Sequence, residues 1–259
     1  LTSTEVSNYV AAGFEISLHL DTACTEYTWD SLNALFTNQL AALATILPGL
    51  PAPRTHRCHC VAWSQYTIMA EVECANGIRL DTTYYYWPPN WSASWPGMFT
   101  GSGMPMRFAT AEGSVIDNFQ AATFMTDESN QVYPYTVDTL LEKALGPEGF
   151  YGAFVCNMHN DQNPSFGANA IVAAATNRNV AVISAGQLLD WVDARNASAF
   201  SSISWNGNKL AFVVKANANA RGLQAMAPVP AGLSVSSIQS NDVTMAYVSS
   251  RVKGMQYAI

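Results

Sequence analysis

The stretch GFEISLH, residues 13–19, decides the fold that we predict for this chain. Its glycine is suited to ending the short amphipathic helix that precedes it, and the remaining residues read as a strand that ends at His19. A long helix follows, which begins at Thr28 or Asp30, carries one apolar stripe and ends before Pro48. Strands that alternate with helices are typical of an α/β protein with a parallel sheet.

The alternation continues to about residue 195. The further strands that we predict are 58–62, 78–82, 115–124, 151–158 and 180–183, and the further helices are 64–74, 136–145, 168–175 and 186–193. Residues 84–113 are rich in aromatic residues, proline and glycine, and we predict that they form a long ordered loop. Loops of this kind often build sites.

After Arg195 the pattern changes to Ser, Thr and Asn that alternate with apolar residues. Asn206-Gly207 is a hairpin turn signal and precedes an apolar strand pattern over residues 209–214. We therefore predict two domains, an α/β domain over residues 1–195 and a small antiparallel β module over residues 196–259.

Composition limits the partners and the location. The chain has 12 Lys and Arg against 19 Asp and Glu, a net charge of -7, so we expect no nucleic-acid partner. No apolar run reaches the roughly 18 to 20 residues of a membrane span, so we expect none. A surface rich in Ser, Thr, Asn and Gln, with five cysteines, favours a secreted or cell-surface protein. The sequence gives no indication of the oligomeric state.

A disulfide is expected near the first two strands. Cys24 would pair with Cys58 or Cys60, because both positions follow the ends of neighbouring predicted strands. The alternative is that all five cysteines are reduced core residues.

Several residues that can carry chemistry fall at predicted strand ends, where parallel α/β folds assemble their sites. They are His19, His59, His159 and Asp81, with Arg57 on the same face of its strand as His59. Such a set indicates a metal site or general acid/base catalysis. The alternative is that they are hydrogen-bonded structural residues. His56 is expected at the surface, and the neighbouring acids Asp127 and Glu128 are expected to be solvated.

Aromatic residues are concentrated in and before the long loop. Aromatic faces can pack on sugar rings, so Trp63, Tyr86 and Trp87 are candidates for substrate contact. The alternative is that these rings form the core of the loop.

Four of these features together resemble the NodB-homology polysaccharide deacetylases, carbohydrate esterase family 4. Residues 13–19 are similar to the segment Gly-His-Glu-Ile-x-x-His that opens the metal-binding motif of this family. His159 after residues 154–158 resembles the histidine of the late Leu-x-His motif, Arg57 resembles the arginine of the third motif, and Asp81 loosely resembles the fourth-motif aspartate. The resemblance covers roughly residues 5–193.

This resemblance implies a distorted (β/α) barrel of the polysaccharide deacetylase type, followed by a β-sandwich-like module. The implied reaction is the metal-dependent removal of acetyl groups from an extracellular polysaccharide, with zinc as the divalent metal that the ligands suit. His19 would bind the metal, His159 would act as general acid, and Asp81 and Arg57 would assist catalysis.

The chain departs from the pattern of the family at two places. The first motif, a Thr-Phe-Asp-Asp-like turn, would precede residue 1, and Ala23 stands where the second metal-binding histidine is expected. We hypothesise that His59 takes the vacant ligand position. A catalytically silent, deacetylase-like carbohydrate-binding or structural module is the main alternative, and another metal-dependent carbohydrate hydrolase is a third.

Overall fold

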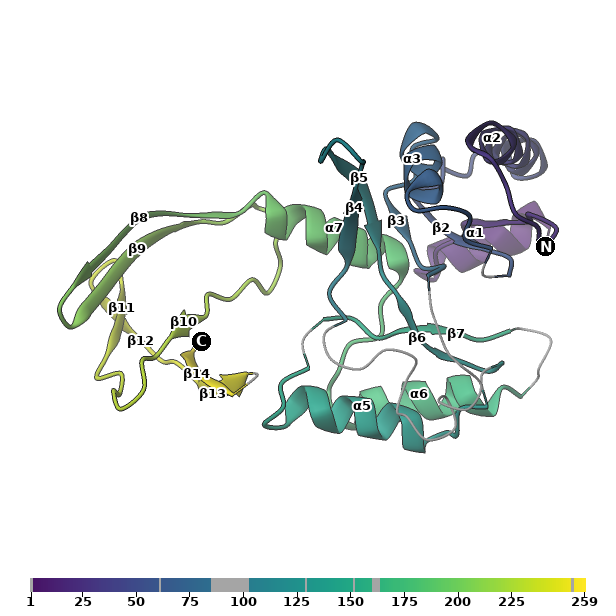
Figure 1. Cartoon of the computed structure of the whole chain (residues 1–259). Helices are drawn as coiled ribbons and strands as arrows, with labels where there is room; N and C mark the ends of the chain where they lie inside the picture. Colours follow the sequence, from purple (N-terminus) through teal and green to yellow (C-terminus); the bar gives the residue numbers. More distant parts are fainter. Residues whose placement is uncertain are drawn as a thin grey trace. The chain divides into compact units, whose positions relative to one another are not determined.

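The computed structural model describes residues 2–60, 62–84, 103–128, 130–150, 152–159, 164–252 and 254–259. The chain divides into two compact units, which are Leu1–Leu141 with Tyr151–Leu189, and Glu142–Phe150 with Asp190–Ile259. Figure 1 shows the helices and strands of each unit.

The first unit is built on a five-stranded sheet with the strand order β1-β2-β3-β5-β4. Strands β1, β2, β3 and β5 are parallel, as predicted, and β4 is antiparallel to β5. Their bounds are β1 Leu18–Leu20, β2 Thr55–Cys58, β3 Leu80–Asp81, β4 Met106–Ala109 and β5 Val115–Gln120. Two predictions were wrong here. We predicted a strand over residues 58–62, but β2 ends at Cys58, because its residues are mostly polar and give no apolar pattern. β4 lies inside the predicted loop of residues 84–113.

Three helices accompany the first strands. They are α1 (Ser3–Ala11), α2 (Trp29–Ile46) and α3 (Ile68–Ala75). Thr28 caps α2 as predicted, because its side chain accepts a hydrogen bond from the backbone N–H of Ser31. The apolar stripe of α2 buries Leu32 and Phe36 in a core that also contains Met69 of α3 and Leu20 of β1. Helices α2 and α3 therefore cover one face of this sheet (Figure 1).

A second, two-stranded parallel sheet pairs β6 (Thr123–Thr126) with β7 (Val155–Asn157). Its core also includes residues of α5 (Tyr135–Leu145) and α6 (Phe166–Asn177), with Phe124, Leu140 and Ile171 at the centre. The predicted strand at 180–183 is not a strand in the structure, because no other described segment pairs with it. Helix α7 (Ala185–Asn196) follows and runs from the first unit into the second.

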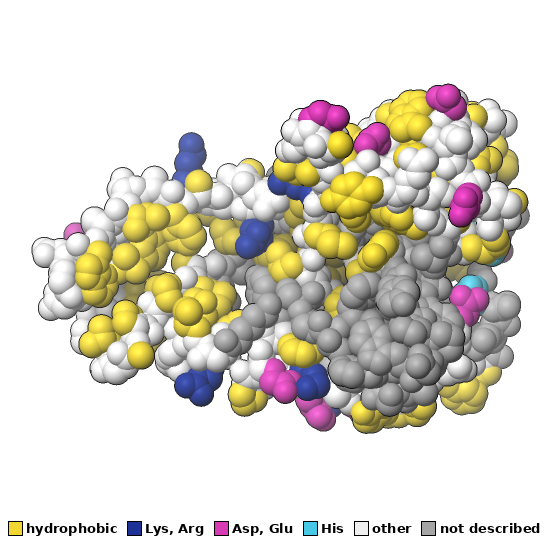
Figure 2. Space-filling model, viewed as in Figure 1, with side chains coloured by type: hydrophobic (Ala, Val, Ile, Leu, Met, Phe, Trp, Pro, Cys, Tyr) yellow, Lys and Arg dark blue, Asp and Glu magenta, His cyan; other side chains and the backbone are white. Residues whose placement is uncertain are grey.

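The second unit is antiparallel in the part that the structure describes. Strands β8 (Ala199–Asn206) and β9 (Lys209–Lys215) form a hairpin at the predicted Asn206-Gly207 turn, where Gly207 has a φ of +62°. The remaining strands are β10 (Ala227–Pro228), β11 (Ile238–Ser240), β12 (Val243–Met245), β13 (Ser249–Val252) and β14 (Met255–Ala258). Hydrophobic side chains gather on the exposed surface of β8 and β9 (Figure 2).

The described residues thus form a mixed α/β structure with six helices and several sheets. The described strands do not close into a barrel. In the same part of the chain, no helix is both long enough and apolar enough to cross a membrane.

Candidate functional site

His19 and Arg57 share one face of the main sheet. In the parallel pairing of β1 with β2, His19 lies opposite Arg57 and Leu18 lies opposite His56. Side chains alternate between the two faces of a strand, so His19 and Arg57 point to one face while Leu18 and His56 point to the other. The second face is the one covered by α2 and α3, since Leu18 packs in their core. The face with His19 and Arg57 is therefore turned away from these helices.

His59 lies beside His19 at the end of the sheet. The backbone N–H of His59 donates to the carbonyl of Leu20 at 2.7 Å, which extends the pairing of the two strands. Nε2 of His19 and Nδ1 of His59 are 3.3 Å apart, and the two rings meet edge to face. Both side chains are exposed. Two imidazole nitrogens thus converge at the carboxyl end of β1 and β2.

The protonation of His19 suits a ligand. Partial burial lowers the pKa of His19, and the neighbouring His59 and Arg57 lower it further. The neutral imidazole, which binds metal ions, is therefore favoured at neutral pH.

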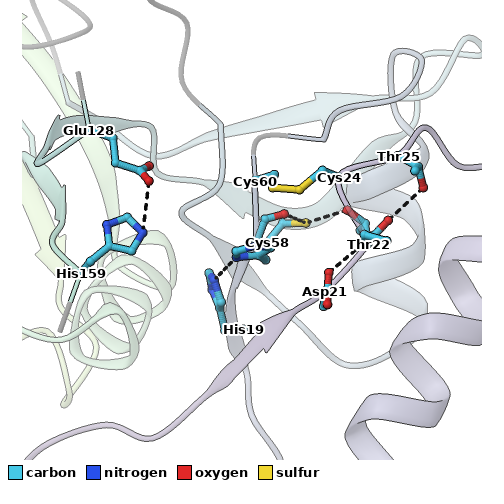
Figure 3. The surroundings of a disulfide bond; sticks show 11 residues. His19, Asp21, Thr22, Cys24, Thr25, Cys58, Cys60, Glu128 and His159 are labelled. Carbon is cyan, nitrogen blue, oxygen red and sulfur yellow. Dashed lines mark hydrogen bonds and ion pairs between the residues drawn. A yellow bond between two sulfur atoms is a disulfide. The ribbon is translucent and has the colours of Figure 1, made fainter. Parts of the chain in front are cut away.

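A disulfide lies next to the histidine pair. It joins Cys24, in the loop after β1, to Cys60, two residues after the end of β2, with 5.6 Å between the Cα atoms (Figure 3). Of the two partners that the sequence left open, Cys60 is the one used, because Cys58 points into the core and is buried there. The sulfurs of Cys24 and Cys60 are bonded to each other, so they do not act as metal ligands with His59.

Arg57 is held in place by hydrogen bonds to two other segments of the first unit. Its Nη1 donates to the carbonyl of Thr82 at 3.0 Å and to Oγ1 of Thr123 at 2.8 Å. Thr123 in turn donates to the same carbonyl of Thr82 at 2.7 Å. The guanidinium therefore ties β2 to the segment after β3 and to β6, and its charge is fixed near the site.

The structure does not bring Asp81 to this face. Asp81 lies opposite His56 in the pairing of β2 with β3, so it points toward α3. It is fully buried, and its Oδ1 accepts hydrogen bonds from Thr83 and lies 3.4 Å from Nδ1 of His56. The prediction that His56 lies at the surface was wrong, because this side chain is buried between Asp81 and Glu73.

His159 forms a second group with two acids, after the ends of β6 and β7. Its Nδ1 lies 2.7 Å from Oδ1 of Asp127, and its backbone N–H donates to Oδ2 of Asp127, also at 2.7 Å. Nε2 of His159 lies 3.5 Å from Oε1 of Glu128 (Figure 3). Asp127 was expected to be solvated, but its side chain is 9% exposed.

Partial burial acts to raise the pKa of Asp127, yet the hydrogen bonds from His159 outweigh it and leave the pKa below its usual range. An ionised Asp127 on Nδ1 orients the ring of His159 and stabilises its protonated form. Asp127 follows β6 directly and His159 lies two residues after the end of β7, so their contact depends on the pairing of these two strands.

Only part of the aromatic group falls in the described residues. Trp63 is partly buried and packs against Tyr84 and Phe108, with ring centroids 5.2 and 5.5 Å apart. Tyr86 and Trp87 lie outside the described residues.

A cavity of about 510 Å³ lies beside β1 and is lined in part by His19 and Arg57. Its lining also includes Glu15 and the apolar residues Val182 and Ile183. Glu15 closes one part of it by hydrogen bonds from Thr55 Oγ1 at 2.5 Å and from the backbone N–H of Gly186 at 2.7 Å. The cavity lies along β1, which pairs with β2 alone among the described strands.

The histidine pair fits a metal ion of the zinc type. Nitrogen ligands bind tetrahedral zinc at about 2.0–2.1 Å, which places two of them roughly 3.3 Å apart. The 3.3 Å separation of the two imidazole nitrogens matches this value, and it equally fits a direct hydrogen bond between the two rings. Within the described residues, no third ligand side chain forms a group with both histidines.

Comparisons of this chain with known protein families, with curated proteins and with solved structures find no match.

Proposed function

We propose that this chain is a metal-dependent hydrolase that removes acetyl groups from an extracellular polysaccharide. The observation that carries the proposal is the 3.3 Å distance between His19 Nε2 and His59 Nδ1. Both histidines lie at the face of the main sheet that is turned away from α2 and α3, which we call the open face. Two imidazoles at this distance suit zinc, and the resemblance to the NodB-homology deacetylases implies a histidine metal site. In this proposal His59 takes the role of the second metal-binding histidine of the family, whose position is occupied by Ala23 in this chain.

The proposal needs a third ligand, which the resemblance implies is a carboxylate of the first motif. Among the described strands β1 pairs with β2 alone, so a strand that carries such a carboxylate could pair with the other edge of β1, next to His19 and the cavity. The proposed fold is the distorted (β/α) barrel of the deacetylases. A hydrogen bond from the backbone N–H of Thr123 in β6 to the carbonyl of Tyr84, in the segment after β3, supports it by placing the two sheets next to each other in the first unit.

A metal ion bound by these histidines would polarise the acetyl carbonyl and lower the pKa of a bound water. The residues of the chain supply the remaining steps. His159, protonated and oriented by Asp127, would donate its Nε2 proton to the leaving amine or alkoxide. Arg57, held by Thr82 and Thr123, would stabilise negative charge near the histidine pair. Asp81 has no catalytic role in this proposal, since it points to the other face.

The substrate and location in the proposal follow from the surroundings of the site. Trp63 packs with two other rings on the first unit and offers an aromatic surface for a sugar ring. The Cys24–Cys60 disulfide supports a secreted or cell-surface protein, because such bonds persist in oxidising compartments.

Metal content and deacetylase activity of the natural full-length protein test the proposal. We expect His19→Ala and His59→Ala each to reduce the zinc content by about one ion per chain, and to abolish acetate release from acetylated polysaccharides. His159→Ala is the matched control, since it should keep the metal and lower activity by about 10²–10⁴-fold. Unchanged zinc content in both the His19 and the His59 variants would contradict the proposal.

The second candidate function is a catalytically silent carbohydrate-binding module. The observation that favours it is the lack of a third ligand beside His19 and His59 within the described residues. Polysaccharide binding without acetate release, unaffected by the removal of metal, would support this candidate.

A further inference from the structure

The covered face of the main sheet holds a histidine and two carboxylates that converge from three elements. His56 comes from β2, Asp81 from β3 and Glu73 from α3. Nδ1 of His56 lies 2.8 Å from Oε1 of Glu73 and 3.4 Å from Oδ1 of Asp81. All three side chains are fully buried. One ligand atom from each residue lies within 4.8 Å of the other two, a spacing that a single ion can bridge.

The three ionisable groups cannot all be charged without leaving a net charge in the core. Two carboxylates face one imidazole, and within the described residues their ion pairs are with His56 alone. If His56 is protonated and both carboxylates are ionised, one negative charge stays uncompensated in the core, which is a costly state for buried groups. Burial and the neighbouring Asp81 raise the pKa of Glu73 to about 8, so a proton on Glu73 balances the charge when no ion is bound. A divalent cation with a neutral His56 makes the group neutral.

Unsatisfied oxygens point to the same conclusion. Oδ2 of Asp81 and Oε1 of Gln120 are buried and lack a hydrogen-bond partner. Nε2 of Gln120 lies 3.3 Å from Oε2 of Glu73, so the amide belongs to the same cluster. Buried oxygens without a donor are rare and require an explanation, of which a bound cation is one.

The surrounding contacts resemble those that orient metal ligands. Thr83 donates to Asp81 through its backbone N–H at 2.8 Å and through its hydroxyl. Gln120 contacts Glu73, and the ring of Phe36 packs against His56 with the centroids 5.0 Å apart. Ligating carboxylates in metal sites are commonly held by such hydrogen bonds.

We propose that His56, Glu73 and Asp81 bind a divalent cation with a preference for nitrogen and oxygen ligands, such as Zn²⁺ or Mn²⁺, as a structural ion between the sheet and α3. This site is separate from the histidine pair, because it lies on the opposite face of the sheet. The ion joins β2, β3 and α3, so it stabilises the layer on which the exposed face is built.

The test uses the full chain folded in medium that contains zinc and manganese. The double variant His19→Ala/His59→Ala alters only exposed side chains, so it should fold, and we expect it to retain about one ion per chain by elemental analysis. X-ray absorption should show one nitrogen and two carboxylate ligands without sulfur. Chelation of this ion should lower the thermal midpoint, because a ligand of the native state stabilises it.

The variant Glu73→Gln, added to this background, should lose the ion, whereas Glu71→Gln on the same helix should keep it. A double variant that folds, carries no ion and does not respond to chelation would overturn the proposal and leave a shared proton as the neutralising charge. The outcomes also separate the two sites. Loss of one ion in the double variant reports on the proposed function, and loss of the remaining ion on Glu73→Gln reports on this site.

Discussion

The two faces of the main sheet use the same residue type in opposite ways. On the covered face, burial alone would lower the pKa of His56, but Asp81 and Glu73 raise it to about 9. On the open face, partial burial and the neighbours His59 and Arg57 lower the pKa of His19. A histidine with buried carboxylates around it becomes part of the framework, whereas a histidine beside another histidine keeps a lone pair for a ligand.

The largest effect that would test this comparison is expected on the covered face. Asp81→Ala removes one partner from a fully buried charged group, so we expect the free energy of unfolding to fall by about 3–5 kcal/mol. Urea unfolding measures the change. The matched control is Asp117→Ala, which removes an exposed partner of Arg79 and should cost no more than about 1 kcal/mol. Similar costs for the two variants would contradict the framework role of the covered face.

The disulfide should have the next largest effect, at the edge of the open face. The paired variant Cys24→Ser/Cys60→Ser opens a link between residues 36 apart and should lower the free energy of unfolding by about 2–4 kcal/mol. It should also weaken zinc binding, because His59 precedes Cys60. Cys74→Ser, at an exposed free cysteine, is the control and should change neither quantity.

The pH dependence of stability should have opposite signs for the two faces in metal-free protein. His56 has a raised folded pKa, so its contribution is complete below about 6.5 and is lost as the pH rises through about 9. We expect a loss on the order of 1–2 kcal/mol between pH 7 and 9.5. His19 has a lowered pKa, so its contribution is lost as the pH falls below its usual value. Urea unfolding across pH 5–9.5 with a chelator measures the contributions of His56 and His19. A rise in stability above pH 7 would contradict the contribution expected for His56.

The smallest effect is expected for the exposed histidines themselves. His19→Gln and His59→Gln should each change the free energy of unfolding of metal-free protein by no more than about 0.5 kcal/mol. Urea unfolding with a chelator present measures it. A cost of several kcal/mol would show that the pair is a structural element, and the contrast between the faces would disappear.

The elements with strong local signals were predictable from the sequence. Thr28, one of the two predicted starts of α2, caps this helix, because the capping hydroxyl and the apolar stripe are both local to the helix. Strand β2 was misplaced and His56 was wrongly expected at the surface for one shared reason. The polar His56 of β2 is buried because it pairs with Glu73 of α3 and Asp81 of β3. The sequence of β2 alone does not reveal these partners.

The candidate site was predictable to the extent that it follows from strand ends. His59 was expected near His19 because parallel strands end at one edge of a sheet, and the two side chains do meet there. The contact of Asp127 with His159 was missed, since two adjacent acids in a loop look solvated until the pairing of β6 with β7 is known. Asp81 points to the covered face because it is in register with His56 of β2. We could not predict this register, because β2 itself was placed at the wrong residues.

The Cys24–Cys60 bond also sets an order of events during synthesis. The segment between the two cysteines contains all of α2, so the bond can close only after this helix has left the ribosome. Cys60 follows His59 directly, and the bond therefore completes the exposed edge when the growing chain meets an oxidant. The position of His59 relative to His19 therefore depends on whether the compartment through which the chain passes is oxidising enough to form the disulfide.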